Sequence, residues 1–244
     1  MIALTINTHS SNLTCLNIFF KYMEKYVGHK YFENVYLFIN PCEYVPPEYV
    51  TTVTYNPDEC FTYQMQHCLS HVHEDTLLYC NEDYIFYDHA KLNLANELYE
   101  KLQHSDFSFI KFVHADTESY KIYEPKLYII DKGSSNNFSQ TLSFWKTNDI
   151  LEIHKNCPPA EIGIKGETLG HLEELAKDVC RKLDIKGLCY YNKEPKRGLF
   201  HFDTEVFPHI ASALVKGKWN LSEYPELRDI LSENNIDFSL RGDM

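Results

Sequence analysis

The stretch Thr76–Asp88, TLLYCNEDYIFYD, contains the pattern that decides the fold. It opens as a continuous apolar run, which is typical of a strand buried on both faces of a parallel sheet. Glu82 and Asp83 follow directly, with apolar and aromatic residues on both sides. Two adjacent carboxylates repel each other and lose hydration beside a core. We therefore expect a cation, a hydrogen-bond partner or a turn to accompany them.

Strand and helix patterns alternate through the preceding residues. We expect strands over 1–9, 34–39, 49–55 and 76–80, and helices over 12–27 and 61–69. This alternation predicts an α/β fold with a largely parallel central sheet and helices on both faces. Ligands of such sheets bind at the carboxyl ends of the strands. Thr8 and His9, after the first strand, are thus expected to face the same crevice as Glu82 and Asp83.

The rest of the chain mixes both patterns. Alternating apolar runs predict strands over 107–113 and 126–130, and the composition of 131–137 (DKGSSNN) predicts a loop. Apolar residues at helical spacing predict helices over 90–102, 142–153, 168–183 and 224–234. We expect a single domain over residues 1–244.

Composition excludes several classes of protein. The 244 residues carry a net charge of −12, which disfavours binding to a nucleic-acid backbone. The eight cysteines show no CxxC pair, so we expect reduced thiols in a cytoplasmic protein. We see neither a signal peptide at the start of the sequence nor an apolar run of membrane-spanning length. We therefore expect a soluble protein without an integral membrane segment.

The carboxylate pair has two interpretations. Hard oxygen ligands suit Mg²⁺ or Mn²⁺, which bind through one or two carboxylates and the phosphates of a ligand. The alternative is an N-cap or turn for the following segment. A zinc site is a separate possibility, since His67 and His71 lie four residues apart with His73 close by, but the HExxH pattern is absent.

Three other groups are candidates for binding or catalysis. The segment 216–220 (KGKWN) with His209 before it is either a phosphate clamp or a solvated turn anchored by a tryptophan. Trp145 and Lys146, after Gln140, could form a wall for a sugar ring or belong to the core. Glu161 and Glu167 flank IGIKG and are candidates for a general base.

In their order along the chain, these features resemble those of a glycosyltransferase of the GT-A type, such as the small bacterial and viral members. The resemblance is carried by LLYCNEDYIFYD, then FSQTLSFWKTNDIL, then FPHIASALVKGKWNLSEYPEL, and it spans residues 1–231. It implies a Rossmann-like GT-A fold. Residues 1–131 would form the half that binds the nucleotide-sugar, and residues 132–244 the half that binds the acceptor.

The resemblance also implies an activity: transfer of a sugar from a UDP-, GDP- or TDP-sugar to a glycan or lipid-linked acceptor. Such enzymes hold Mn²⁺ or Mg²⁺ on the diphosphate through a DxD motif. Here the motif is Asn81-Glu82-Asp83, with Asp83 as the principal metal ligand and Glu82 as the second ligand or a contact to the ribose. The departure from DxD leaves open a weak metal site or none. The other roles implied are diphosphate contacts from His209, Lys216 and Lys218, His209 being a further candidate metal ligand, and a base that is Glu161, with Glu167 and Asp203 in reserve.

Two rival functions remain at this point. A nucleotidyltransferase also uses a metal and carboxylates at strand ends, but it usually has a Gly-rich N-terminal loop with basic residues, which NTHSSN does not match. A catalytically inactive glycosyltransferase-like module would bind the sugar or nucleotide without turnover.

Overall fold

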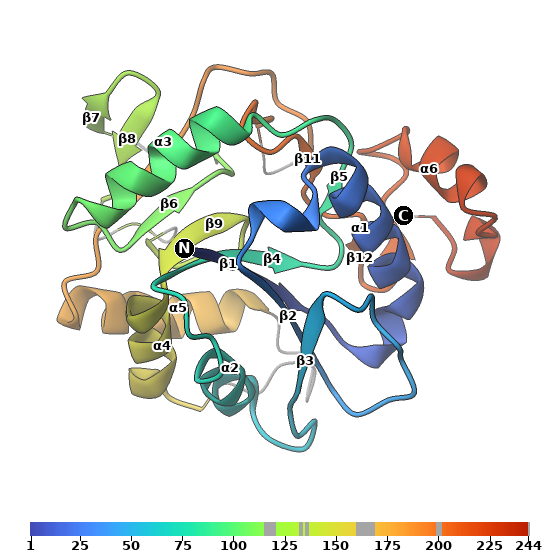
Figure 1. Cartoon of the computed structure of the whole chain (residues 1–244), viewed down its shortest axis with the longest axis horizontal. Helices are drawn as coiled ribbons and strands as arrows, with labels where there is room; N and C mark the ends of the chain where they lie inside the picture. Colours follow the sequence, from blue (N-terminus) through green and yellow to red (C-terminus); the bar gives the residue numbers. More distant parts are fainter. Residues whose placement is uncertain (115–120, 132–133, 135–136, 160–168, 199–201, 244) are drawn as a thin grey trace.

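The computed structural model describes residues 1–114, 121–131, 134, 137–159, 169–198 and 202–243. Within these residues, nine strands form one central sheet in the order β3-β2-β1-β4-β9-β6-β10-β8-β7 (Figure 1). Strands from before and after residue 131 alternate in the middle of this sheet. Side chains from both parts therefore share the same core.

Four parallel strands make up one side of the sheet: β3 (Val50–Thr54), β2 (Asn34–Ile39), β1 (Ile2–Asn7) and β4 (Thr76–Asn81). β1 and β4 are buried on both faces, as their continuous apolar sequences predict. Asn7 pairs in register with Asn81. The segments that leave these two strands consequently start side by side at one edge of the sheet.

The other side of the sheet is mixed. β9 (Ser143–Lys146) runs antiparallel between β4 and β6 (Phe109–Lys111), and β10 (Gly187–Tyr190) pairs parallel with β6. The antiparallel strands β8 (Leu127–Ile129) and β7 (Lys121–Glu124) complete the sheet. The mostly parallel α/β architecture expected from the sequence is thus confirmed, with an antiparallel strand at its centre.

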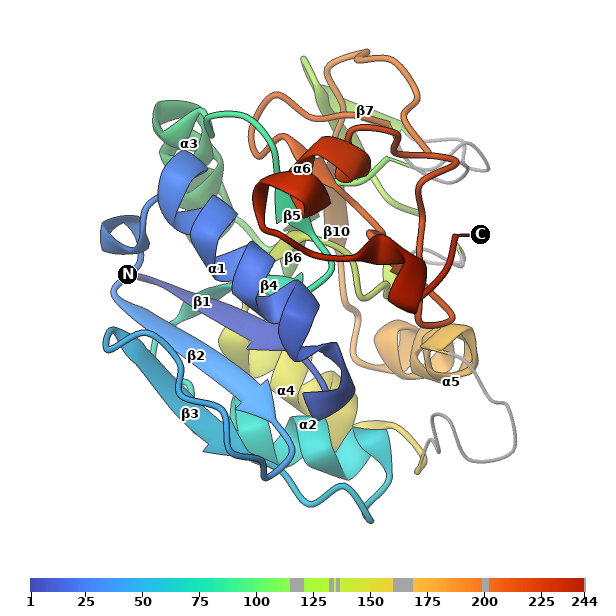
Figure 2. The same cartoon turned by 90° about the vertical axis from the view of Figure 1, so that its right-hand side faces the viewer.

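Helices cover both faces of the sheet (Figure 2). α1 (Leu13–Tyr26) and α3 (Leu92–Gln103) pack on one face. α2 (Phe61–Leu69), α4 (Thr147–Asn156) and α5 (Leu169–Lys182) pack on the other. Each presents an apolar stripe at helical spacing, such as Leu16, Phe19 and Met23 of α1.

A further layer lies outside α1. α6 (Leu227–Glu233) packs there with two small sheets, β5 (Ile85–Phe86) with β11 (His209–Ile210), and β12 (Leu214–Val215) with β13 (Lys218–Trp219). Three short 3₁₀ helices complete the described elements: η1 (Ser10–Asn12), η2 (His29–Tyr31) and η4 (Phe238–Leu240). Residues from the end of the chain are thereby brought against the segment that follows β4.

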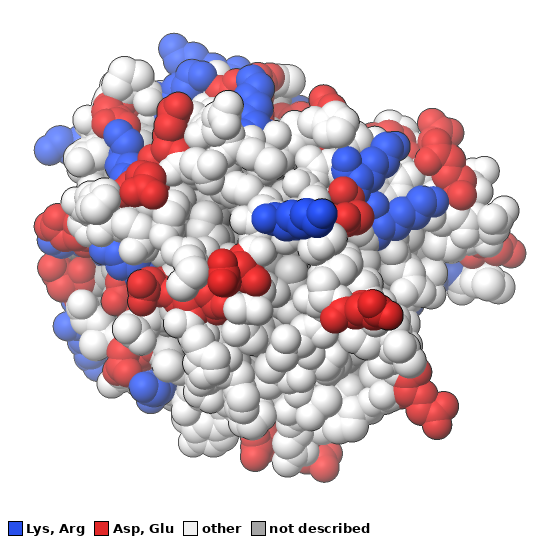
Figure 3. All heavy atoms as spheres, viewed as in Figure 1, with Lys and Arg blue, Asp and Glu red and all other residues white. Residues whose placement is uncertain are grey.

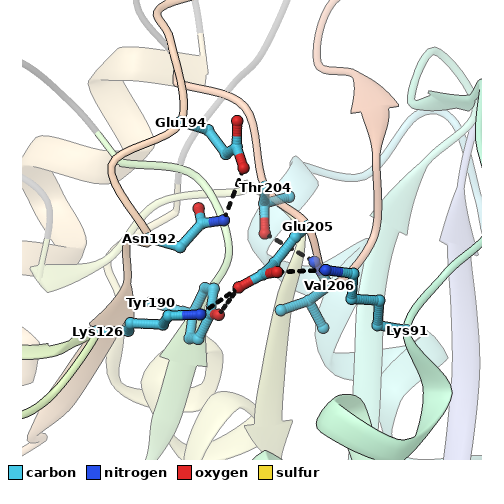
Figure 4. Close-up of polar contacts among 8 residues, drawn as sticks. All are labelled: Lys91, Lys126, Tyr190, Asn192, Glu194, Thr204, Glu205 and Val206. Carbon is cyan, nitrogen blue, oxygen red and sulfur yellow. Dashed lines mark hydrogen bonds and ion pairs between the residues drawn. The ribbon is translucent and has the colours of Figure 1, made fainter.

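Glu205 fixes the segment that leads into this outer layer (Figure 4). Its carboxylate accepts hydrogen bonds from Lys91, from Lys126 at 2.6 Å and from the Tyr190 hydroxyl at 2.6 Å. The bonds from Lys126, Lys91 and Tyr190 lower the pKa of Glu205 to about 2. Three elements far apart in the sequence thus meet at one ionised carboxylate.

The surface carries charges of both signs. On the face shown in Figure 3, Lys and Arg side chains are interspersed with Asp and Glu. None of the helices that the structure describes is both long enough and apolar enough to cross a bilayer.

One expected element differs. The sequence predicts a helix over 142–153, but Ser143–Lys146 forms β9 and the helix begins at Thr147. A short apolar run does not distinguish a buried strand from a helix by periodicity. Here Phe144 and Trp145 point to opposite faces of the sheet and pack in different clusters, which a strand permits and a helix does not.

Gly187 is expected to tolerate no side chain. A Cβ built at this position would overlap the ring of Phe109, which is buried and stacked on Trp145 with ring centroids 4.3 Å apart. Gly187→Ala should therefore lower the free energy of unfolding by about 1–3 kcal/mol in urea denaturation. The double variant with Phe109→Leu should recover part of the loss, and an unchanged midpoint in the single variant would contradict this packing.

Candidate active site

A cavity of about 700 Å³ opens at the carboxyl ends of β1 and β4. Thr8 and His9 after β1 line it together with Glu82 and Asp83 after β4. The other walls come from the segment 55–64, the segment around Gln140, helix α5 and the β12–β13 turn. The carboxylates and the residues after β1 therefore share one crevice, at the place where α/β sheets bind their ligands.

Glu82 is held in place by the start of α1. Its side chain is 7% exposed, and Oε1 accepts a hydrogen bond of 2.6 Å from Asn12 Nδ2. Its backbone carbonyl accepts a bond of 3.4 Å from the Cys15 thiol. Burial raises the pKa of Glu82 to about 7, although hydrogen bonds from its own backbone, Asn12 and Thr8 act in the opposite direction.

Asp83 lies beside it and is partly buried. Its backbone carbonyl accepts a hydrogen bond of 3.0 Å from the amide of Ala213, which connects the pair to the outer layer. Burial, followed by the charge of Glu82, raises the pKa of the Asp83 carboxyl well above its usual range. Without a cation, the two carboxyl groups therefore do not both ionise readily at neutral pH.

The pair fits a divalent cation of the hard type. Two adjacent carboxylates with raised pKa values and a cavity in front of them lack positive charge, which Mg²⁺ or Mn²⁺ supplies. In the described part of the chain, no cluster of three or more His, Cys, Asp or Glu side chains is arranged to hold a metal. Phosphate oxygens and water would have to complete the coordination.

One basic side chain, Lys216, lines the cavity, and a second, Arg241, lies beside it. Lys216 and Gly217 line it at the β12–β13 turn, where both adopt positive φ angles of 52° and 77°. Arg241 Nη2 donates to the Ser11 carbonyl at 2.6 Å, and Nη1 donates to the Gly217 carbonyl at 3.4 Å. Arg241 is not among the residues that line the cavity, but it connects the lining residue Gly217 to Ser11, and its charge acts to lower the pKa of Glu82.

Gln140 and Glu173 form the opposite wall. The Gln140 carbonyl accepts hydrogen bonds from the Tyr84 hydroxyl at 2.7 Å and from Asn81 Nδ2 at 3.2 Å. Its backbone amide donates to Glu173 Oε1 at 3.1 Å. Through these bonds, the backbone of Gln140 connects the end of β4 to α5 along this wall of the cavity.

The structure brings together some of the predicted residues. Thr8, His9, Glu82, Asp83, Gln140 and Lys216 line the cavity. Sequence reasoning missed Asn12, Glu173 and Arg241. Asn12 is the N-cap residue of α1, and Glu173 lies on α5, whose amphipathic pattern explains only its apolar side. Arg241 lies in the last four residues, RGDM, which contain no recognisable motif.

Other predicted residues lie elsewhere. Trp145 is in the core against Phe109, and Lys146 Nζ donates to the Ser105 carbonyl at 2.6 Å. His209 is buried, with Tyr84 and Phe86 next to its ring. None of these three lines the cavity.

Two further predictions on the C-terminal side also fall outside the cavity lining. Lys218 is exposed on β13, although it is only two residues from Lys216. Asp203 accepts a hydrogen bond from the Tyr87 hydroxyl and lies 3.6 Å from Arg197. Glu161 and Glu167 lie outside the described residues, so their roles stay predictions.

We compared the chain with protein families, curated proteins and solved structures. No family model matches the sequence, and the search of curated proteins finds no match. Among solved structures, a CMP:2-keto-3-deoxy-manno-octonic acid synthetase complexed with CTP matches 96% of this chain and 99% of its own, with TM-score 0.53 and 9% identity. The fold is that of the nucleotide-diphospho-sugar transferases.

Two other solved structures match with similar scores. A UDP-glucose pyrophosphorylase complexed with UDP-glucose matches 78% of this chain and 90% of its own, with TM-score 0.51 and 12% identity. S. aureus TarS 1–349 matches 98% of this chain and 68% of its own, with TM-score 0.52 and 9% identity. At such identities the likeness concerns the fold alone.

The raised pKa of Glu82 predicts a pH-dependent cost in stability. The folded state keeps a proton that the unfolded state loses as pH rises above about 4.5, so stability falls until pH reaches about 7. In EDTA, Glu82→Gln should therefore raise the free energy of unfolding by about 1–3 kcal/mol at pH 8 and by little at pH 4. Urea denaturation at both pH values tests this.

The substitution keeps an oxygen acceptor for Asn12, so the difference between the two pH values reports charge. Glu59→Gln, at an exposed position on the rim of the same cavity, is the matched control and should change stability by less than about 0.5 kcal/mol. Equal effects of Glu82→Gln at pH 4 and pH 8 would contradict the assignment.

Proposed function

We propose that this protein is a glycosyltransferase that moves a sugar from a nucleoside diphosphate donor to an acceptor hydroxyl with the help of a divalent cation. The observation that carries the proposal is the desolvated Glu82 and Asp83 pair, which lines the cavity at the carboxyl end of β4. The fold, shared with enzymes whose structures contain CTP or UDP-glucose, supports a nucleotide ligand there. The glycosyltransferase TarS has the same fold.

Each wall of the cavity has a part in this activity. Glu82 and Asp83 would hold the cation, and Mn²⁺ or Mg²⁺ bound there would supply positive charge to offset that of the departing diphosphate. Arg241 and Lys216 approach from the C-terminal side and neutralise phosphate oxygens. Tyr55, with its hydroxyl bonded to the Thr8 carbonyl at 2.8 Å, offers a rigid aromatic surface to the nucleoside.

The range of possible donors is broad, because UDP-, GDP- and TDP-sugars all present the diphosphate that this arrangement would recognise. A glycan or a lipid-linked sugar would serve as the acceptor. A cytoplasmic location, including contact with a membrane surface, is compatible with this chemistry and forms part of the proposal.

A nucleotidyltransferase is the second candidate, because the solved structures with this fold include a nucleotidyl transferase from Methanothermobacter as well as the synthetase with CTP and the UDP-glucose pyrophosphorylase. That reaction displaces pyrophosphate from a nucleoside triphosphate, whose extra phosphate needs additional positive charge. The loop that follows β1, residues 8–12, contains no Lys or Arg. This absence favours a diphosphate donor. A binding module without turnover remains the third candidate, and the experiments below distinguish all three.

Metal-dependent nucleotide binding is the first expected result. Calorimetric titration of UDP and of GDP in Mn²⁺ should show micromolar binding of one nucleotide, and EDTA should weaken it. Asp83→Asn should abolish the increment due to Mn²⁺ because one of the two carboxylate ligands is lost. Asp88→Asn, at an exposed site beyond β5, is the control and should bind as the wild type does.

Three outcomes separate the candidates. Binding of the diphosphate with release of UDP or GDP from the matching nucleotide-sugar supports a glycosyltransferase. Release of pyrophosphate from a nucleoside triphosphate supports a nucleotidyltransferase. Binding of the nucleotide without either release supports the inactive module, and unchanged Mn²⁺ dependence in Asp83→Asn would remove the metal site.

Arg241 should contribute to diphosphate affinity. Arg241→Gln is expected to weaken binding of UDP or GDP by about tenfold, because a charge-assisted hydrogen bond is worth at least about 1.5 kcal/mol, and to leave the weaker binding of the nucleoside unchanged. Arg228→Gln is the matched control, since Arg228 pairs with Asp243 at 3.2 Å, whereas Arg241 is bonded to the lining residue Gly217. Equal losses for nucleoside and diphosphate would show that Arg241 acts only on the shape of the rim.

A further inference from the structure

Gln140 has an unusual side chain for its position. It is 5% exposed and lines the cavity, yet neither Oε1 nor Nε2 has a hydrogen-bond partner among the residues that the structure describes. Leaving a buried amide unpaired destabilises the folded state. Buried amides are normally paired, and an exception beside a cavity indicates a ligand that completes the hydrogen bonds.

The backbone of Gln140, unlike its side chain, is held by hydrogen bonds. Bonds from Asn81 and Tyr84 hold its carbonyl, and its amide is bonded to Glu173. Gln140 is therefore attached on one side to the strand that ends in the carboxylate pair, and on the other to α5. A ligand group beside Gln140 lies between the proposed cation site and Glu173.

Glu173 is the carboxylate on the far wall of the cavity. Its Oε1 is bonded to the Gln140 amide, and Lys111, buried on β6, acts on it electrostatically. Burial raises the pKa of Glu173, while the bond from Gln140 and the charge of Lys111 limit the rise. Glu173 is thus an oriented carboxylate in a partly desolvated setting, which suits proton abstraction.

We propose that Gln140 and Glu173 form the sugar subsite of this cavity: Gln140 binds hydroxyl groups of the transferred sugar, and Glu173 takes the proton from the attacking hydroxyl. The subsite rests on the glycosyltransferase function proposed above. With Glu173 as the general base, the base lies within the residues that the structure describes. A reaction of this kind inverts the configuration at the anomeric carbon.

The step balances as a direct displacement. The O–H bond of the acceptor breaks and its proton goes to the Glu173 carboxylate. The oxygen forms a new bond to the anomeric carbon, while the bond from that carbon to the phosphate oxygen breaks. The bonding pair leaves with the nucleoside diphosphate, on the side of Glu82 and Asp83. Because attack and departure occur on opposite faces of the sugar, its configuration inverts.

The first experiment tests Glu173 with donors alone, since water can replace the acceptor. Release of nucleoside diphosphate from UDP-glucose, UDP-N-acetylglucosamine and GDP-mannose is measured for the wild type, and the best substrate is kept. Glu173→Gln should lower kcat at least 100-fold and leave the Kd of the diphosphate with Mn²⁺ unchanged. Glu174→Gln, an exposed neighbour on the same helix, is the matched control and should retain kcat.

Stereochemistry provides a second readout for Glu173. ¹H NMR of the sugar released early in the reaction should show the anomer opposite to that of the donor. Retention of configuration would overturn the role of Glu173, as would wild-type kcat in Glu173→Gln. Loss of kcat in Glu161→Gln or Glu167→Gln, with Glu173→Gln fully active, would return the base to the residues predicted from sequence.

The second experiment tests Gln140 by removing its amide at nearly constant volume. Gln140→Leu should raise the urea midpoint, because the unpaired amide is gone, and should remove the affinity that UDP-glucose or the chosen donor gains over its diphosphate. Gln66→Leu is the control for stability, since Gln66 Nε2 donates to the His154 carbonyl at 2.8 Å and its loss should lower the midpoint.

The outcomes separate the subsite from the function on which it rests. Absence of any nucleotide binding by the wild type would overturn both. Nucleotide binding and donor turnover, with an unchanged ratio of donor to diphosphate affinity in Gln140→Leu, would overturn the role of Gln140 and leave the glycosyltransferase standing. A lowered midpoint in Gln140→Leu would show that the amide is paired in solution.

Discussion

The close approach of two like charges at the end of β4 is the constraint around which the cavity is built. Glu82 and Asp83 follow a strand that is buried on both faces, so their carboxyl groups lose water as the strand enters the sheet. Asn12 and the backbone around the pair return only part of that solvation. In such an arrangement, the positive charge that the carboxylates lack has to come from a bound ligand. This is the physical reason for placing a cation and phosphates there.

The sequence predicted the fold and the position of the cavity where a single segment contained the whole pattern. The buried strand TLLYC followed by Glu82 and Asp83 predicted both the parallel sheet and the edge at which the cavity lies, because burial on two faces leaves a continuous apolar run. Ser143–Lys146 was harder to predict. Its four residues fit a helix as well as a strand, and only pairing with β4 and β6 decides between them.

The site could be predicted only in part for a related reason. Thr8, Glu82 and Asp83 follow strand ends, a position that pattern analysis can recognise. Glu173 reaches the cavity, and Arg241 the lining residue Gly217, through tertiary packing of α5 and the C-terminal segment, which no local pattern records. Trp145 shows the opposite error. Its aromatic ring suggested a sugar wall, but the residue lies in a central strand where the ring stacks on Phe109.

The antiparallel strand β9 also determines when the sheet can close during synthesis. β1 to β4 can pair once residue 81 has left the ribosome, but β4 then has an open edge on the side that β9 later fills. β6 has no neighbour until residues 143–146 and 187–190 arrive. Such open, apolar edges promote association between chains. The half-formed sheet thus keeps these edges open until residues 143–146 and 187–190 have been synthesised.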